Sequence, residues 1–188
     1  MTGGPPPELP SWAVVTPDRI AHITRVADLA ERWAAERGVA PAELARWRLA
    51  AVLHDALRDA DATVLARYTP RGDWPPKLWH GPAAAAAAER DGETDRGVLD
   101  AVRYHSVGFA GWDEAGRMLY LADFLEPGRR HDRAELDALA ARVAAEPAAV
   151  LAAVAARRLA RLVHEGRPIR KETWEFWNSL RDASSSSA

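Results

Sequence analysis

Six polar residues stand where the helical pattern of this sequence calls for apolar side chains. They are His22, His54, Asp55, His80, His105 and Asp123. Asp55 and Asp123 interrupt apolar helical segments, and the four histidines lie at or beside the ends of expected helices. A charged carboxylate that is buried alone is strongly destabilising, so these residues call for a cation nearby. Imidazole nitrogens and carboxylate oxygens together suit Fe, Mn, Zn and similar divalent ions.

Each of these residues also has an ordinary structural explanation. A single histidine on a helix face is more often a hydrogen-bonded core residue than a metal ligand. Asp55 alone would be a polar helix end, and Asp123 alone a buried hydrogen-bond acceptor. The order and the intervals of the whole set favour a metal site. The pair His131-Asp132 follows a break in the helical pattern and begins a helix, so we interpret Asp132 as an N-cap and exclude the pair.

Helical periodicity supplies the elements that position these residues. Thr16 and Pro17 predict the start of a helix that ends at Gly38, and Pro41 opens a second helix. Further helices are predicted around 63–68 with Asp61 as its cap, and over 82–90, 94–105, 113–125, 132–145, 147–165 and 172–181. Residues 69–81 are rich in Pro and Gly and predict a loop. No alternation of period two appears, so we expect an all-α fold.

Composition limits the class of protein. The chain has 188 residues, 48% of them hydrophobic and 28% charged, with a net charge of −2. This indicates one globular domain, and it gives no basic excess of the kind that nucleic-acid binders show. The absence of cysteine excludes thiolate metal sites. No signal peptide or membrane-spanning run is visible, so we expect a cytoplasmic protein that binds neither nucleic acid nor membrane.

The order H…HD…H…H…D, with its local contexts, resembles the HD-domain superfamily of metal-dependent phosphohydrolases. The first two contexts are RIAHITRVADLAERWA at 19–34 and LAAVLHDALRD at 49–59. Later segments are similar to the YqeK-type symmetrical diadenosine tetraphosphate hydrolases, namely LWHGPAAA at 78–85, AVRYHSVG at 101–108, YLADFLEPGR at 120–129 and GRPIRKETWEFWNSL at 166–180. The resemblance implies a single HD-domain helical bundle over 16–183, with a flexible segment at 1–15 and a disordered tail at 184–188.

The resemblance implies a metal-dependent hydrolase with one or two ions. The primary ion, most often iron, with Mn, Co or Mg as alternatives, would be held by His22, His54, Asp55 and Asp123. His80 and His105 would complete a second metal site or bind phosphate directly. Asp55 is the natural bridge between two ions, because a carboxylate has two oxygens. A metal-activated water would attack a phosphoanhydride of diadenosine tetraphosphate to give two ADP, with Asp55 or Asp123 orienting or deprotonating that water.

The implied substrate contacts combine these ligands with cations and a C-terminal segment. They are Arg19, Asp55, His80, His105, Ser106, Asp123, Arg129, Ile169 and Thr173. Arg58, where the family usually has lysine, and Lys77 are further candidates for phosphate binding. Trp174 or Trp177 would stack on adenine or belong to the core, and Trp74 and Trp79 could form a lid.

Several alternatives stay open at this point. The partner would be a small dinucleoside polyphosphate or ADP, but the same site could hydrolyse a nucleoside monophosphate, a deoxynucleoside triphosphate or a cyclic dinucleotide. A catalytically silent nucleotide-binding protein is a further alternative, and the intact ligand set argues against it. The apolar helix at 147–162 would serve either the core or a homodimer interface.

Overall fold

The computed structural model describes residues 7–69, 74–128 and 132–185, with the side chains described up to Arg181. The elements, in chain order, are α1 (Pro17–Arg37), α2 (Pro41–Leu53), α3 (Ala62–Leu65), the short 3-10 helix η1 (Pro76–Leu78), α4 (His80–Arg90), α5 (Arg96–Tyr104), α6 (Glu114–Leu125), α7 (Arg133–Arg142), α8 (Pro147–His164) and α9 (Lys171–Ser185). The described residues contain no strand, and the predicted all-α fold of a single helical domain is confirmed. Within them, no helix combines the length and the apolar character needed to cross a bilayer.

Local signals placed several helix ends correctly. The Thr16 side chain accepts a hydrogen bond from the Arg19 amide, which caps α1. Gly38 ends α1 in the left-handed region, at φ 63°, where glycine is favoured. Asp61 caps α3 through the amides of Thr63 and Val64.

Other predicted helix ends were wrong. Asp95, rather than Thr94, caps α5, because its carboxylate accepts a hydrogen bond from the Val98 amide. Asp132 occupies the predicted N-cap position of α7, but it makes no capping bond, and its carboxylate instead accepts a hydrogen bond of 2.6 Å from Arg157. His80 begins α4 instead of lying in a loop, and α7 ends at Arg142, short of the predicted 145.

The chain ends were predicted as a flexible segment at 1–15 and a tail at 184–188. Residues 1–6 and 186–188 lie outside the described part of the chain. Within it, the Val14 amide donates to the Ala56 carbonyl at 2.8 Å, and the Trp12 indole donates to Asp91 at 3.2 Å. Helix α9 continues to Ser185, two residues beyond the predicted boundary at 183.

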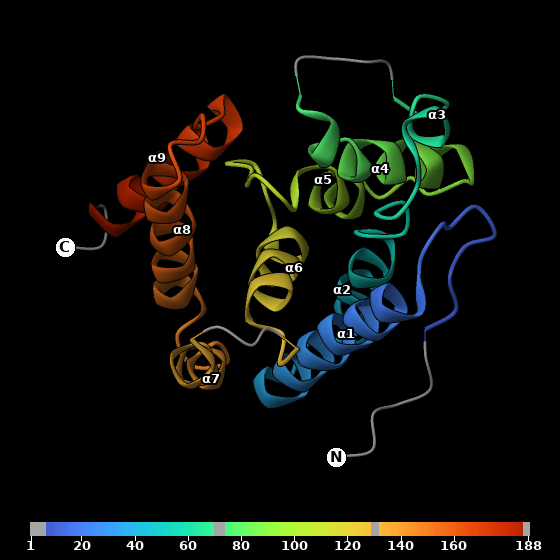
Figure 1. Ribbon diagram of the computed structural model, residues 1–188. Coiled ribbons are helices and arrows are strands. Elements are labelled where there is room, and N and C mark those ends of the chain that lie inside the picture. The colour runs from blue at the N-terminus through green and yellow to red at the C-terminus, as the bar shows by residue number, and fades with distance from the viewer. Residues whose placement is uncertain (1–6, 70–73, 129–131, 186–188) are drawn as a thin grey trace.

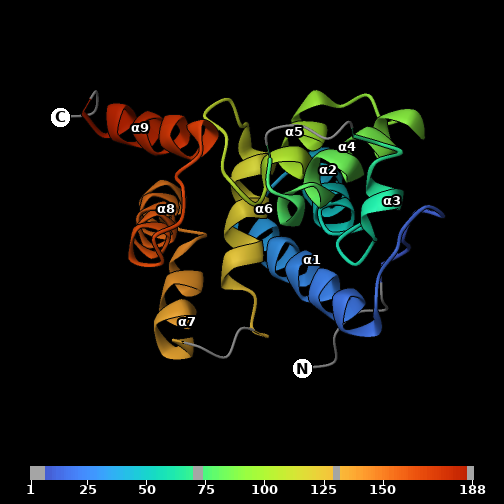
Figure 2. The ribbon, with the colours of Figure 1, turned by 45° about the horizontal axis from the view of Figure 1, so that its top comes forward.

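The core forms where α1, α2, α5 and α6 pack together, with α4 against α5. Large side chains such as Trp33, Trp47 and Leu119 are fully buried there. The Trp33 indole also donates to the Ala140 carbonyl at 3.0 Å and so ties α1 to α7. Helix α6 stands between the other helices of this group and α8, which lies on its other side with α9 (Figure 1). The view in which the top is turned forward by 45° shows the same arrangement (Figure 2).

Candidate metal centre

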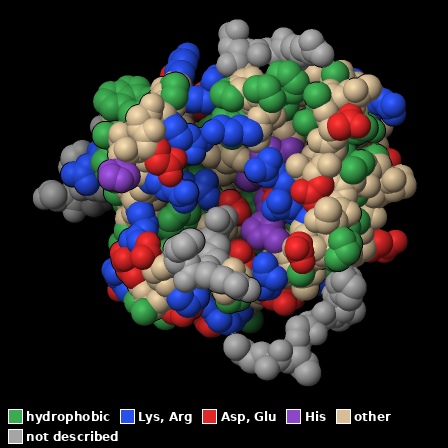
Figure 3. Space-filling model, in the orientation of Figure 1, with side chains coloured by type: hydrophobic (Ala, Val, Ile, Leu, Met, Phe, Trp, Pro, Cys, Tyr) green, Lys and Arg blue, Asp and Glu red, His purple; other side chains and the backbone are tan. Residues whose placement is uncertain are grey.

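A cavity of about 500 Å³ opens between α8 and the ends of the core helices. Figure 3 shows histidine side chains in a hollow on this face, with Lys and Arg side chains gathered around them. The cationic residues that line the cavity are Arg19, Arg58, Lys77, Arg158, Arg161 and Arg167. Three carboxylates also line it, those of Asp55, Asp123 and Glu126. The cavity therefore combines an acidic and imidazole floor with a cationic rim.

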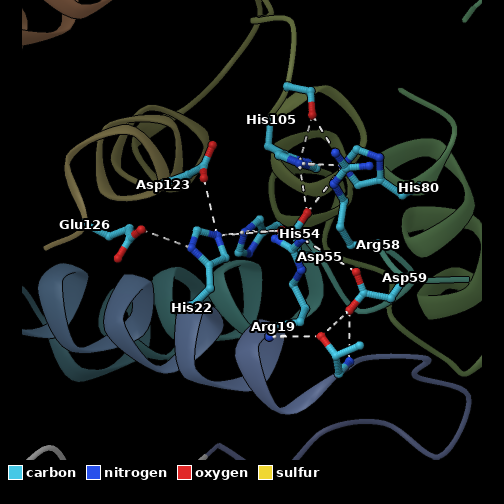
Figure 4. Close-up of polar contacts among 12 residues, drawn as sticks. Arg19, His22, His54, Asp55, Arg58, Asp59, His80, His105, Asp123 and Glu126 are labelled. Atoms are coloured by element: carbon cyan, nitrogen blue, oxygen red, sulfur yellow. Dashed lines mark hydrogen bonds and ion pairs between the residues drawn. The ribbon is translucent and has the colours of Figure 1, made fainter. Parts of the chain in front are cut away.

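The six polar residues singled out in the sequence lie together (Figure 4). Five of them line the cavity, and the sixth, His54, is fully buried with its Nε2 atom 3.3 Å from that of His22. His22 lies in the second turn of α1, and His54 and Asp55 follow the end of α2. His80 begins α4, and His105 follows the end of α5. Asp123 lies in the last turn of α6. All six residues are at most 9% exposed, so helix ends carry them into the interior.

Three of the imidazoles are oriented by backbone carbonyls three residues earlier. The Nδ1 atom of His54 donates to the Ala51 carbonyl at 2.7 Å, and that of His105 donates to Val102 at 2.8 Å. His80 makes the same contact with Lys77 at 3.1 Å. A neutral imidazole that donates through Nδ1 presents an unprotonated Nε2, which is the form that binds metal ions.

The first potential metal site consists of His22, His54 and Asp123. The Nε2 atoms of His22 and His54 are 3.3 Å apart, and the Nε2 atom of His22 is 3.4 Å from Asp123 Oδ1. The second site consists of Asp55, His80 and His105. Its two Nε2 atoms are 3.1 Å apart. Unprotonated nitrogens at the distance between His80 and His105 repel each other unless a cation lies between them. In both groups the three donor atoms lie close enough together to share one metal ion.

Asp55 lies between the two sites. Its Oδ2 atom is 3.6 Å from the Nε2 atoms of both His22 and His54. Its Oδ1 atom is 3.3 Å from His80 Nε2 and 3.5 Å from His105 Nε2. Each oxygen therefore faces one pair of histidines, which is the arrangement that a bridging carboxylate needs.

Burial and neighbouring charges favour the ligand forms of His54, His80 and Asp55, and positive charge at His22. Burial lowers the pKa of His54 to about 4 and also lowers the pKa of His80, so both are neutral near pH 7. Burial alone would raise the pKa of Asp55, but the surrounding imidazoles, His54 first, hold it well below its ordinary value. Burial alone would lower the pKa of His22, but Asp123 and Glu126 outweigh this effect and raise it to about 9. The carboxylates thus strongly favour positive charge at His22.

Sequence reasoning missed Glu126, which is 3% exposed. Its carboxylate lies 3.4 Å from His22 Nδ1 and accepts hydrogen bonds from Arg25 at 2.6 Å and from the Gly128 amide at 2.7 Å. Burial would raise the pKa of Glu126, but these partners lower it to about 2. Glu126 therefore orients the His22 ring, as carboxylates do for metal-bound histidines. The only sequence signal was its place in the EPGR run that drew attention to Arg129.

Arg158 was also missed, because it lies on a helix that the sequence assigned to the core or to a dimer. Its Nη2 atom donates to Asp123 Oδ2 at 2.9 Å, which leaves Oδ1 facing His22. The guanidinium also lies 4.3 Å from the centre of the Tyr120 ring and 5.1 Å from that of Phe124. Arg158 therefore fixes the orientation of a candidate metal ligand from a helix distant in sequence.

Only some of the predicted substrate contacts line the cavity. Arg19 lines the cavity, with its Nη1 atom 2.6 Å from Asp55 Oδ2, and Ser106 lines it beside His105, at 3.0 Å from Nε2. Ile169 and Thr173 are not among the lining residues. Ile169 is 42% exposed, and the Thr173 hydroxyl donates to the Val107 carbonyl at 2.8 Å. Arg129 lies outside the described residues.

The tryptophans considered for a lid or for stacking lie elsewhere. Trp74 and Trp79 line a second cavity, of about 380 Å³, together with Tyr68 and Tyr104. The Trp79 indole donates to the Trp74 carbonyl at 2.5 Å. Trp174 is 55% exposed. These indoles therefore do not cover the cavity that contains the histidines.

Comparison with known proteins gives three findings. The family model described as HD domain matches residues 19–141, which contain all six candidate ligands. Two curated relatives carry the name bis(5'-nucleosyl)-tetraphosphatase, symmetrical. The Bacillus subtilis (strain 168) protein is 32% identical over 110 residues, which cover 54% of this chain and 55% of the relative. The Staphylococcus aureus (strain NCTC 8325 / PS 47) protein is 30% identical over 119 residues, which cover 59% of this chain and 60% of the relative.

The third finding is a solved structure from Clostridium acetobutylicum, described as a predicted HD superfamily hydrolase involved in NAD metabolism. It superposes with a TM-score of 0.79 over 90% of this chain and 92% of its own, at 22% identity. At this identity the likeness establishes the fold. The chain spans little more than half the length of the two curated relatives.

Proposed function

The chain belongs to the HD domain family, and from this membership and the site we propose that it is a metal-dependent phosphohydrolase that cleaves diadenosine tetraphosphate symmetrically to two ADP. The observation that carries the proposal is the position of Asp55, whose two oxygens each face a pair of histidines. The names of the two curated relatives support the choice of substrate.

In this proposal, His22, His54, Asp55 and Asp123 hold a primary ion, with iron as the first choice and Mn, Co or Mg as alternatives. Asp55, His80 and His105 hold a second ion or contact phosphate directly. Divalent ions at such a site polarise phosphate oxygens and lower the pKa of a bound water toward neutrality. Asp55 and Asp123 orient the attacking water or accept its proton.

The phosphate chain of the substrate needs cations, and the rim of the cavity offers them. Arg19 already lies against Asp55, and Arg58 lies near His80, where Figure 4 shows its guanidinium beside the imidazole. Arg58 stands where the resembling family usually has lysine; a guanidinium keeps the charge and offers more donors in a fixed plane. The Ser106 hydroxyl would donate to a phosphate oxygen near His105.

Contacts to the nucleoside belong to the C-terminal segment in this proposal. Ile169 and Thr173 lie just before and at the start of α9, and Arg129 is proposed to contact phosphate. The Thr173 hydroxyl donates to the carbonyl of Val107, the residue after Ser106, and this contact supports a position of α9 next to the proposed phosphate contacts.

The test is hydrolysis of diadenosine tetraphosphate by the metal-loaded protein in ¹⁸O-labelled water. We expect ADP as the sole product, with one labelled oxygen in each pair of ADP molecules, on a β-phosphate. Formation of ATP and AMP would contradict symmetrical cleavage. Faster turnover of a nucleoside monophosphate, a deoxynucleoside triphosphate or a cyclic dinucleotide would identify that nucleotide as the substrate instead. Failure to cleave any of these compounds would indicate a catalytically silent nucleotide-binding protein.

A further inference from the structure

One face of helix α8 changes along its length from apolar to cationic side chains. Val150, Leu151, Val154 and Ala155 are buried where the helix packs against α6. Residues three and four positions apart share a helix face, so this face continues with Arg158 and Arg161. Both line the cavity. The buried apolar residues of this face therefore end where the core ends. The next residues on the same face are arginines that lie over the candidate metal centre.

The turn after α8 adds a third arginine. Gly166 has φ 61°, a left-handed conformation that glycine adopts without strain, and it reverses the chain after the helix. Arg167 then lines the cavity as well. Glu165 accepts hydrogen bonds from Arg161 at 2.6 Å and from Arg167 at 3.1 Å, and so holds the two guanidiniums near each other. We call Arg158, Arg161 and Arg167 the α8 arginines.

Cations also line the cavity from the opposite side. Arg58, after α2, donates to the carbonyl of Lys77 in η1 at 3.3 Å. Among the described residues, no carboxylate lies within ion-pair distance of Arg58 or Lys77. Helix α8 lies across α6 from α2 and α4 in both ribbon views (Figures 1 and 2). The metal centre is thus flanked by cations from two sides.

We propose that the α8 arginines form a subsite for the part of a polyphosphate chain that extends beyond the scissile bond, and that they select substrates with several linked phosphates over single phosphate groups. The inference rests on the proposed phosphate chemistry of the site. A single phosphate needs only the metal centre, whereas a longer chain carries further negative charges that require partners. The α8 arginines also lie outside residues 19–141, so they are separate from the matched domain that contains the ligands.

The test measures binding of inorganic tripolyphosphate and of orthophosphate to the full metal-loaded chain by titration calorimetry, with the metal content checked afterwards. The variant combines Arg161→Ala and Arg167→Ala, which leaves Arg158 and its bond to Asp123 in place. We expect tripolyphosphate to bind about tenfold more weakly and the preference over orthophosphate to fall by a similar factor. The charge reversal Arg161→Glu should weaken tripolyphosphate binding further than Arg161→Ala does.

The matched control is Arg157→Ala on the same helix. Arg157 pairs with Asp132 and Glu135 and is not among the residues that line the cavity, so the preference for tripolyphosphate should not change. An unchanged preference in the double variant, or an equal loss for both anions, would overturn the subsite. If the preference depends on the arginines but diadenosine tetraphosphate is not cleaved, the subsite stands and the proposed substrate fails. If ADP is formed and the preference is unchanged, the subsite alone fails.

Discussion

The candidate metal centre and the α8 arginines are built in opposite ways. The candidate ligands are buried, and each imidazole is fixed in orientation because a carbonyl or a carboxylate is the partner of its Nδ1 atom. The side chains of Arg161 and Arg167 are 73% and 38% exposed, and both are held by the single carboxylate of Glu165. Buried, fully partnered groups fix one geometry, whereas exposed charges adapt to a ligand.

This difference in structure corresponds to a difference in proposed role. The groups that would hold metal lie within the matched residues 19–141, and the cations that would select the ligand include arginines from α8, beyond that region. Arg158 connects the two regions, because it lines the cavity and also bonds to Asp123. Changes in the metal centre should therefore have large effects on turnover, and changes around it graded effects.

The largest effect is expected from Asp55→Asn. The amide removes the negative charge and one of the two oxygens that face the histidine pairs, so metal content should fall and hydrolysis should drop by roughly three orders of magnitude or more. Metal analysis, product assay and far-UV circular dichroism measure these changes. Asp61→Asn is the control, because Asp61 caps α3 at an exposed position and asparagine still caps helices well. Full metal content in the Asp55→Asn variant would show that Asp55 is not a metal ligand.

An intermediate effect is expected from Glu126→Gln. The glutamine carbonyl can still accept a hydrogen bond from His22, but one of the carboxylate charges that raise the pKa of His22, after that of Asp123, is lost. Metal affinity should fall about tenfold, within the range typical of groups that orient metal ligands. Competition with a chelator measures the affinity. Glu114→Gln is the control, at the start of α6, the helix that Glu126 follows. It should leave the metal affinity unchanged because Glu114 pairs with Arg37. Equal affinities for both variants would show that Glu126 does not support His22.

The smallest effect is a pH dependence of stability in protein stripped of metal. The pKa of His22 in the folded chain is about 9, above its ordinary value of 6.5. The stabilisation is therefore fully present below pH 6.5 and is lost as the pH rises through 9, with a change of up to about 3 kcal/mol in the free energy of unfolding. The lowered pKa values of His54 and His80 affect stability only below about pH 6.5, outside this window.

Urea unfolding of chelator-treated protein at pH 6.5 and pH 9 measures this change. Metal-loaded protein is the comparison, and the loss attributable to His22 should disappear there because a metal ion at Nε2 takes the place of the proton whose release causes the loss. The same loss in both forms would show that His22 is not a ligand.

Local signals explain how much of this molecule could be predicted. The bonds that cap α1 and α3 join residues at most three positions apart, so Thr16 and Asp61 were identified from the sequence. The choice between Thr94 and Asp95 failed because Asp95 is also held by Arg46, 49 positions away. Asp132 failed as a capping side chain for the same kind of reason, since Arg157 binds its carboxylate.

The sequence alone determined the all-α class, most helix ends and, through family resemblance, the six residues of the candidate metal centre. These follow from hydrogen bonds and periodicities within a few residues of the chain. Only the tertiary structure decided that Asp55 faces both histidine pairs, that Glu126 supports His22 and that α8 brings arginines over the centre. Such contacts depend on how α8 packs across α6 and how five helix ends converge, and no local pattern encodes those distances.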